Sequence, residues 1–202
     1  MQIFISRGDS KGFWTFDTEE TVLEKEEYEF EGKYYKYLNL RICCGKNGNT
    51  EIGNVLIYCF HMDAIELDGE NLVDIADSIN QEVYDAINVV SAIDLLPGYV
   101  WERPVLCYLE TLYINPEFRG KGIGSWILKN LHELITFYYD TEAYGFVTYP
   151  RPSDGHDDSE LLEEIIKLDP MYQHMVDLLE RNEFKRIDET NYFFRNCSGI
   201  SN

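Results

Sequence analysis

The chain is 202 residues long and 45% of them are hydrophobic, which is enough to bury a full core and excludes a disordered chain, so one domain over residues 1–202 is expected. Its 37 acidic and 17 basic residues give a formal net charge of −20, which argues against nucleic acids and anionic membranes as partners because like charges repel. No stretch approaches the about 20 apolar residues of a membrane-spanning helix, and the apolar start at residues 1–6 is too short for a signal peptide, so a cytoplasmic location is expected.

The first part of the chain predicts strands. Residues 1–33 are acidic, and we expect strands or loops within residues 13–31. Residues 34–44 and 52–61 are rich in Tyr, Ile, Val and Leu, and the Asn47-Gly48 step between them is typical of a tight hairpin turn. These two segments predict the central antiparallel hairpin of a sheet.

A helix is expected after this hairpin. Apolar residues recur at helical spacing from Leu72 to Val90, and they follow Asn71, whose side chain can cap a helix N-terminus. Five cysteines, odd in number and without the spacing of a metal site, are expected to be buried free thiols: Cys43, Cys44, Cys59, Cys107 and Cys197.

The most informative stretch joins a strand to a helix. Residues 105–114 form an apolar run that predicts a buried strand, which ends at Asn115-Pro116. Helical spacing begins at Ile123 and continues to Tyr138. The turn between them contains three closely spaced glycines, Gly120, Gly122 and Gly124.

This corner has the chemistry of a phosphate site. The first N–H groups of a helix have no intrahelical partner and carry the positive end of the helix dipole, so they bind anions. Glycine lets a diphosphate approach these amides closely, and Arg119 and Lys121 add cationic side chains. The glycine spacing fits neither a P-loop nor a dinucleotide-binding fold.

The same residues resemble the acyl-CoA site of the GNAT N-acyltransferases, whose pattern is Arg/Gln-x-x-Gly-x-Gly/Ala after a strand and a Pro-containing turn. Arg119, Gly122 and Gly124 fill this pattern. The resemblance implies an α/β fold of the α+β type, with a mixed, mostly antiparallel central sheet flanked by helices, and acetyl-CoA as co-substrate. It implies a CoA site made of Leu112, Tyr113, Ile114, Arg119, Gly120, Lys121, Gly122, Ile123, Gly124 and Ser125.

The resemblance also divides the chain. Simple GNAT domains connect the flanking strands more directly, so residues 62–104 are interpreted as a helical insertion that walls the acceptor site. The CoA-binding core follows at about 105–135. Beyond it the resemblance implies a strand at 145–149, a helix at 171–182 and a final strand at 184–195.

The segment before the predicted helix at 171–182 contains turn formers, acids and one histidine. A short helix is expected over 161–166, and Asp169 is expected to cap the helix that follows. A single histidine among acids in a loop is typical of a solvated turn, so no metal is expected at Asp154, His156, Asp157 and Asp158.

Two departures from the family pattern concern catalysis. Leu179 stands where the family often has a tyrosine that protonates the departing CoA thiolate, and Glu183 stands where the family has glycine. Two interpretations of Tyr172 stay open: its phenol replaces the missing acid, or its ring packs on the helix face with Met175 and Leu179.

Acetyl transfer to an amine needs a group that accepts the proton of the amine. Glu110 is our candidate base or substrate anchor, because a carboxylate among apolar strand residues has a raised pKa; a rim acid with a salt bridge is the alternative. No spacing of a Ser-His-Asp or Cys-His nucleophile is visible, which favours direct transfer in a ternary complex.

The sequence therefore predicts an N-acetyltransferase that moves an acetyl or short acyl group from acetyl-CoA to a primary amine. The negative charge favours a cationic small molecule or peptide as acceptor. Two alternatives stay open, a catalytically silent CoA-binding protein and an acidic interaction protein. The sequence also leaves the choice between monomer and homodimer open.

Overall fold

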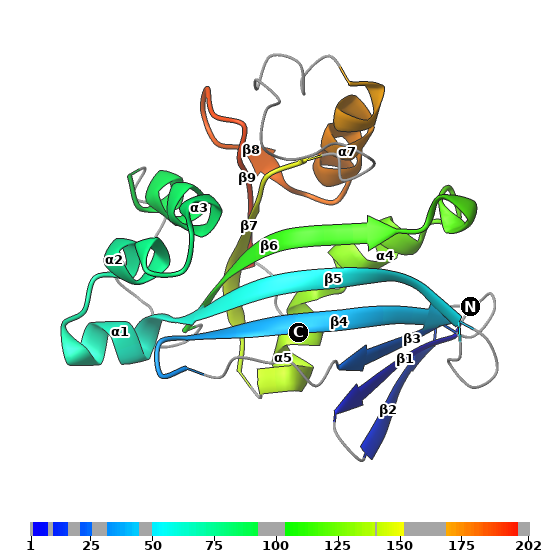
Figure 1. Cartoon of the computed structure of the whole chain (residues 1–202), viewed down its shortest axis with the longest axis horizontal. Helices are drawn as coiled ribbons and strands as arrows, with labels where there is room; N and C mark the ends of the chain where they lie inside the picture. Colours follow the sequence, from blue (N-terminus) through cyan, green and yellow to red (C-terminus); the bar gives the residue numbers. More distant parts are fainter. Residues whose placement is uncertain are drawn as a thin grey trace.

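A computed structural model of the chain describes residues 2–7, 10–15, 21–25, 32–44, 50–92, 104–139, 141–151 and 169–197. Its strands form one nine-stranded sheet in the order β2-β1-β3-β4-β5-β6-β7-β9-β8, with helices packed on both faces (Figure 1). Two neighbouring pairs, β1 with β3 and β6 with β7, are parallel, and the other pairs are antiparallel. The predicted fold class, a mixed and mostly antiparallel sheet flanked by helices, is confirmed.

The predicted central hairpin is confirmed. Strand β4 (Tyr35–Cys44) pairs antiparallel with β5 (Thr50–His61), and β5 pairs antiparallel with β6 (Val105–Ile114). The predicted turn at Asn47-Gly48 lies outside the described residues. On the N-terminal side the sheet continues through β3 (Thr21–Lys25), β1 (Gln2–Arg7) and β2 (Ser10–Thr15).

Side chains alternate between two cores along the central strands. On β6, Val105, Cys107 and Leu109 belong to the core under one face, whereas Leu106 and Tyr108 belong to the core under the other. This alternation is the two-residue period of a strand buried on both faces. The cysteines are free, and those at 43, 59, 107 and 197 are buried, as expected from the sequence.

The single helix predicted over 71–90 is wrong, because three short helices follow β5: α1 (Met62–Asp68), α2 (Leu72–Asp77) and α3 (Gln81–Ala92). The predicted cap is present, since Asn71 Oδ1 accepts from the N–H of Val73 at 2.8 Å. A second asparagine starts α3, where Asn80 Oδ1 accepts from the N–H of Val83 at 2.9 Å. A side chain that caps a helix start competes with helix continuation, so Asn80 separates α2 from α3.

The helix predicted after the glycine corner is also divided. It consists of α4 (Ile123–Lys129) and α5 (Leu131–Tyr139), which meet at Asn130. The Asn130 N–H is shared between the carbonyls of Trp126 and Ile127, both at 3.1 Å, and this sharing tightens the last turn of α4. Both helices pack their buried residues into the first core.

The C-terminal part begins with β7 (Ala143–Thr148), parallel to β6, and continues with α7 (Pro170–Arg181). Asp169 caps α7 as predicted, since its side chain accepts from the N–H of Met171 at 2.7 Å. The strand predicted over 184–195 is instead two antiparallel strands, β8 (Lys185–Arg186) and β9 (Phe193–Asn196). Asp188, with φ 40°, turns the chain between them. The predicted helix at 161–166 lies outside the described residues.

Candidate functional site

Strand β6 contains a β-bulge directly after the point where its pairing with β7 ends. In the pairing of β5 with β6, Ile57 faces Leu109 and Leu56 faces Thr111, so Glu110 is the extra residue. Leu109 belongs to the first core and Leu112 packs against the same core, although alternation alone would place them on opposite faces. The bulge thus resets the alternation and directs Glu110 away from this core.

The opening itself is the point where β6 and β7 part. Their parallel pairing ends at Leu109 and Thr148, where Thr148 Oγ1 donates to the carbonyl of Leu109 at 2.8 Å. Strand β6 continues to Ile114, but β7 ends at Thr148. The edge of β6 beyond Leu109 therefore faces a gap instead of a β7 strand in the part of the chain that the structure describes.

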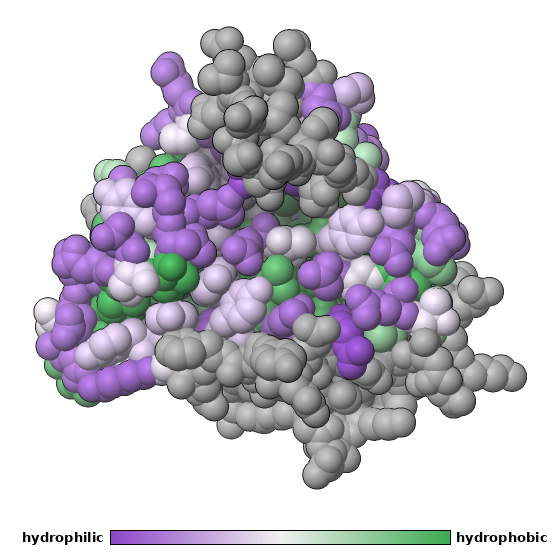
Figure 2. All heavy atoms as spheres, viewed as in Figure 1, coloured by the Kyte–Doolittle hydropathy of each residue, from purple (hydrophilic) through white to green (hydrophobic). Residues whose placement is uncertain are grey.

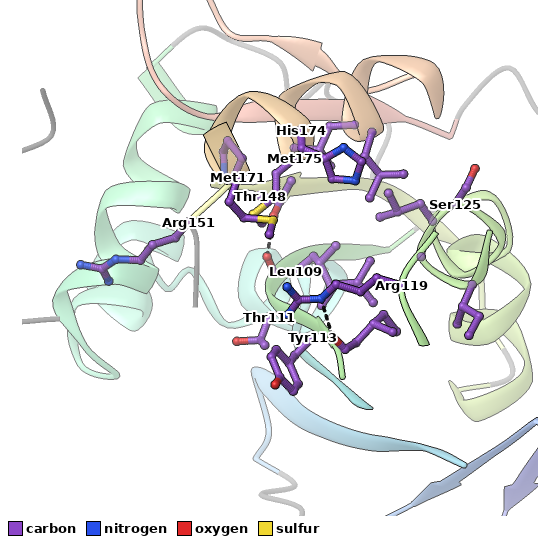
Figure 3. A pocket seen from close by; sticks show the side chains of 18 of the residues that line it. Leu109, Thr111, Tyr113, Arg119, Ser125, Thr148, Arg151, Met171, His174 and Met175 are labelled. Atoms are coloured by element: carbon purple, nitrogen blue, oxygen red, sulfur yellow. Dashed lines mark hydrogen bonds between the residues drawn. The ribbon is translucent and has the colours of Figure 1, made fainter. Parts of the chain in front are cut away.

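A pocket of about 640 Å³ fills this gap. Its walls come from β6 and the corner after it, the first turn of α4, one face of α7, the residues after β7, and Glu82 of α3 (Figure 3). The volume lies within the range of small-molecule sites, ~300–1,000 Å³. The pocket brings together most of the predicted site: Glu110, Leu112, Tyr113, Ile114, Arg119, Gly120, Gly122, Ile123, Gly124 and Ser125.

Two of the corner glycines are required by backbone conformation. Gly120 and Gly122 have φ of 72° and 82°, in the left-handed region that side chains rarely adopt. A Cβ on either residue would meet nothing within 4 Å, so the space in front of them is open. A Cβ on Gly124 would instead lie 3.5 Å from Leu178 Cδ2, so this glycine sits where α4 packs against α7.

The start of α4 presents amides to the pocket. Gly122 is the N-cap, and the first intrahelical bond runs from the N–H of Trp126 to the Gly122 carbonyl at 2.9 Å. The N–H groups of residues 123–125 precede this bond, so the helix offers them no acceptor. All three residues line the pocket. The arrangement suits an anion of the size of a diphosphate.

The two predicted cations of the corner are placed differently. Arg119 lines the pocket, and its Nε donates to the carbonyl of Ile114 at 2.7 Å while its guanidinium carbon lies 5.5 Å from the ring centre of Tyr113. These contacts hold Arg119 against the end of β6. Lys121 is not among the residues that line the pocket; its ammonium lies 4.7 Å from the ring centre of Phe118.

Glu110 is half-buried at the opposite end of the pocket. Burial raises the pKa of its carboxyl, and the nearby charge of Glu82 raises this pKa further. Glu82 forms an ion pair with Arg151, which lines the pocket after β7. Behind Glu110, the rings of Tyr58 and Tyr108 stack with their centres 6.4 Å apart, and burial raises the pKa of both hydroxyls. This end of the pocket therefore holds two carboxyl groups, of which that of Glu82 is paired with Arg151.

The position of Tyr172 on α7 favours one of the two interpretations that the sequence leaves open. Tyr172 is buried in the first core, and its hydroxyl is buried without a hydrogen-bond partner among the described residues. It does not line the pocket, so its packing with Leu179 is what this geometry supports, and a role as acid has no support here. Met175 lines the pocket and does not share that core.

The face of α7 toward the pocket includes a residue that the sequence interpretation missed, His174. Met171, His174, Met175 and Leu178 line the pocket together (Figure 3). The spacing of these four residues places them on one helix face, but nothing in the sequence indicates that this face meets the pocket. Leu179, at the family's tyrosine position, also lines the pocket.

The end of α7 is joined to the start of α4. Ser125 Oγ donates to Asn182 Oδ1 at 2.9 Å, and Asn182 Nδ2 donates to the Leu178 carbonyl at 2.6 Å. Asn182 is buried, so these bonds satisfy its amide. The hydroxyl of Ser125, a predicted CoA contact, is therefore already engaged in a hydrogen bond that joins α4 to the end of α7.

Neither a metal centre nor a membrane helix is seen in the described ranges. They contain no group of three or more His, Cys, Asp or Glu side chains arranged to hold a metal ion. Asp154, His156, Asp157 and Asp158 lie outside these ranges. None of the described helices combines the length and the apolar character that crossing a bilayer requires.

Comparison with known proteins gives a family match over the site. The model of the acetyltransferase (GNAT) family matches residues 78–154, which include β6, the glycine corner, α4 and β7. The search of curated proteins found no match. Among solved structures, the crystal structure of mosquito arylalkylamine N-acetyltransferase like 5b is similar with a TM-score of 0.40 and 11% identity, over 78% of this chain and 74% of that chain. The word arylalkylamine in that name describes the mosquito protein and not this chain.

Proposed function

We propose that this chain, whose residues 78–154 match the model of the acetyltransferase (GNAT) family, transfers an acetyl or short acyl group from acetyl-CoA to a primary amine. The observation that carries the proposal is one continuous pocket. It joins an unpaired strand edge to the amides at the start of α4, and it has a half-buried carboxyl at the other end.

The residues present fit acetyl-CoA. The open space before Gly120 and Gly122 and the amides of residues 123–125 suit the diphosphate. The unpaired edge of β6 at residues 112–114 offers main-chain groups to the amides of the pantetheine arm. This arrangement would direct the thioester toward Glu110, at the other end of the same strand.

Glu110 is proposed as the base or the anchor of the acceptor. A neutral amine attacks the thioester carbonyl directly, and the amine nitrogen must lose a proton as the amide bond forms. A carboxyl with a raised pKa accepts this proton more readily than an ordinary glutamate would. Glu82 at the same end is paired with Arg151, so a cationic acceptor such as a polyamine is favoured by the net charge of −20.

The test has two stages. Acetyl-CoA should raise the melting temperature of the protein by mass action if the cradle binds it. Release of free thiol from acetyl-CoA is then followed with spermidine, kanamycin, tyramine and a lysine peptide as acceptors. Turnover with one of them supports the enzyme. Binding without turnover on this panel favours the silent CoA-binding alternative, and the absence of both favours an acidic interaction protein.

A further inference from the structure

The pocket needs a proton donor for the departing thiolate, and the tyrosine position of the family holds Leu179. Besides three arginines, the titratable side chains that line the pocket are those of Glu82, Glu110, Tyr113, Tyr149 and His174. Arginine stays protonated at all ordinary pH values and cannot serve as a proton donor. Glu82 is engaged by Arg151, and Glu110 is the proposed acceptor of the amine proton.

His174 belongs to the wall of the pocket that α7 forms. Met171, His174, Met175 and Leu178 line the pocket from this helix, and Asn182 at its end is bonded to Ser125 of α4. Leu178 Cδ2 would lie 3.5 Å from a Cβ on Gly124, so the later part of this face adjoins the glycine corner.

His174 lies one helical turn before Leu178 on this face, which is about 6 Å along the helix axis. Glu110 of β6 and His174 of α7 line the same pocket. The imidazole and the proposed site of the thioester therefore share one cavity.

The position of His174 allows it to be reprotonated after each turnover. Its side chain is exposed although it lines the pocket, so it can regain a proton from solvent. Imidazole is the side chain that most readily exchanges a proton near neutral pH. Tyr149, by comparison, packs its ring 5.5 Å from that of Tyr192, and Tyr113 lies under Arg119.

We infer that His174 donates the proton that the CoA thiolate takes up. This inference rests on the proposed function. As the amine nitrogen bonds to the acetyl carbon, the carbon–sulfur bond breaks, and sulfur leaves with the electron pair. The imidazolium of His174 protonates this sulfur to give CoA thiol. Glu110 receives the proton lost by the amine and returns it to solvent, and neutral His174 takes a proton from solvent.

The charged groups that share the pocket with His174 come from several elements. They are Glu82 on α3, Glu110 on β6, Arg119 in the corner, Arg151 after β7, and Arg181 further along α7. A pH profile of the wild type alone would mix their effects. The test therefore compares variants at His174 with a matched control at Gln173, an exposed neighbour on α7 that does not line the pocket.

In the test, kcat and KM are measured with acetyl-CoA and the best acceptor of the panel, and the Kd of CoA is measured by calorimetry. His174→Ala and His174→Gln should lower kcat by about 100-fold, the lower range of general acid catalysis, and leave the Kd of CoA within about threefold. The alkaline limb of the wild-type kcat profile should be lost in both variants. Gln173→Ala should keep kcat and Kd unchanged.

The outcomes separate the two proposals. Full kcat in both His174 variants, or a loss that appears in Tyr149→Phe and not in them, overturns the role of His174 and leaves the enzyme in place. A raised Kd of CoA with unchanged kcat overturns it as well and makes His174 a CoA contact. A wild type that acetylates none of the panel amines overturns both proposals.

Discussion

At the scale of single residues, the glycine corner shows why three glycines in five positions are not equivalent. Gly120 and Gly122 adopt left-handed backbone conformations, whereas Gly124 lies close to Leu178 of α7. Only the first two combine a conformation that excludes side chains with open space that a ligand can occupy. Replacing a glycine in this corner therefore has two separable effects, on stability and on binding.

The variant Gly122→Ala separates these effects. The alanine should cost about 1 kcal/mol of stability for its left-handed backbone, and its Cβ should lower the affinity for acetyl-CoA at least tenfold. Gly69→Ala is the matched control, since Gly69 has φ 70° and equally open space but ends α1, away from the pocket. Calorimetry should show unchanged binding for that control. Equal affinities in the two variants would refute the diphosphate cradle.

Glu110 leads to a prediction on pH. Its pKa is raised by folding, so the folded protein holds this proton at pH values where the unfolded chain has lost it. Its contribution to stability is complete below the ordinary glutamate pKa and is lost as pH rises through the folded pKa. Glu110→Gln should therefore gain stability relative to the wild type between pH 5 and pH 8, as measured by urea unfolding.

The exposed Glu117→Gln is the control for that measurement and should show no such gain. The activity of Glu110→Gln should be low at all pH values, because an amide accepts no proton. A wild type and a Glu110→Gln variant whose stabilities change in parallel from pH 5 to pH 8 would contradict the raised pKa.

At the scale of elements, α7 ends in a Schellman motif formed by an unusual residue. The N–H of Phe184 donates to the Leu179 carbonyl at 3.1 Å, and the N–H of Glu183 donates to the Glu180 carbonyl at 3.2 Å. This motif places Glu183 at φ 70°, where helices usually have glycine. The departure from the family pattern at Glu183 thus changes the residue and keeps the backbone.

Glu183→Gly should therefore stabilise the protein by about 1 kcal/mol, because glycine adopts this conformation without strain. Urea unfolding measures the gain. Glu183→Ala removes the same charge and keeps the strain, so it should give no comparable gain. A similar gain in both variants would assign the effect to relief of negative charge instead of backbone conformation.

At the scale of the whole molecule, charge is the dominant feature. The net charge is −20, and most of the described surface in Figure 2 is hydrophilic, with apolar residues in small patches. In the pocket, Arg119 lies at the corner and Arg181 on α7, whereas Glu110 and the ion pair of Glu82 with Arg151 lie at the other end. Under the proposed function, the anionic cofactor would lie toward the corner and the acceptor toward Glu110.

This charge predicts a salt dependence. The kcat/KM for spermidine should fall several-fold when NaCl is raised from 20 to 200 mM, because salt screens the attraction between the acidic protein and a polycation. Tyramine, with one charge, should show a smaller decrease in the same assay. Equal salt dependence for the two amines would indicate that the acidity serves solubility and not the encounter with substrate.

Sequence alone determined the strand at 105–114, the hairpin at 34–61, the corner at 119–125 and the caps at Asn71 and Asp169, because local spacing, turn chemistry and capping carry these features. Sequence periodicity did not predict the helix breaks at Asn80 and Asn130. These breaks depend on hydrogen bonds of the two asparagines to main-chain groups three or four residues away, and the spacing of apolar residues does not reflect such bonds. Only the tertiary structure decided which side of α7 meets the pocket. That choice depends on how α7 packs across α4 and the sheet, and it placed His174 in the pocket and Tyr172 in the core.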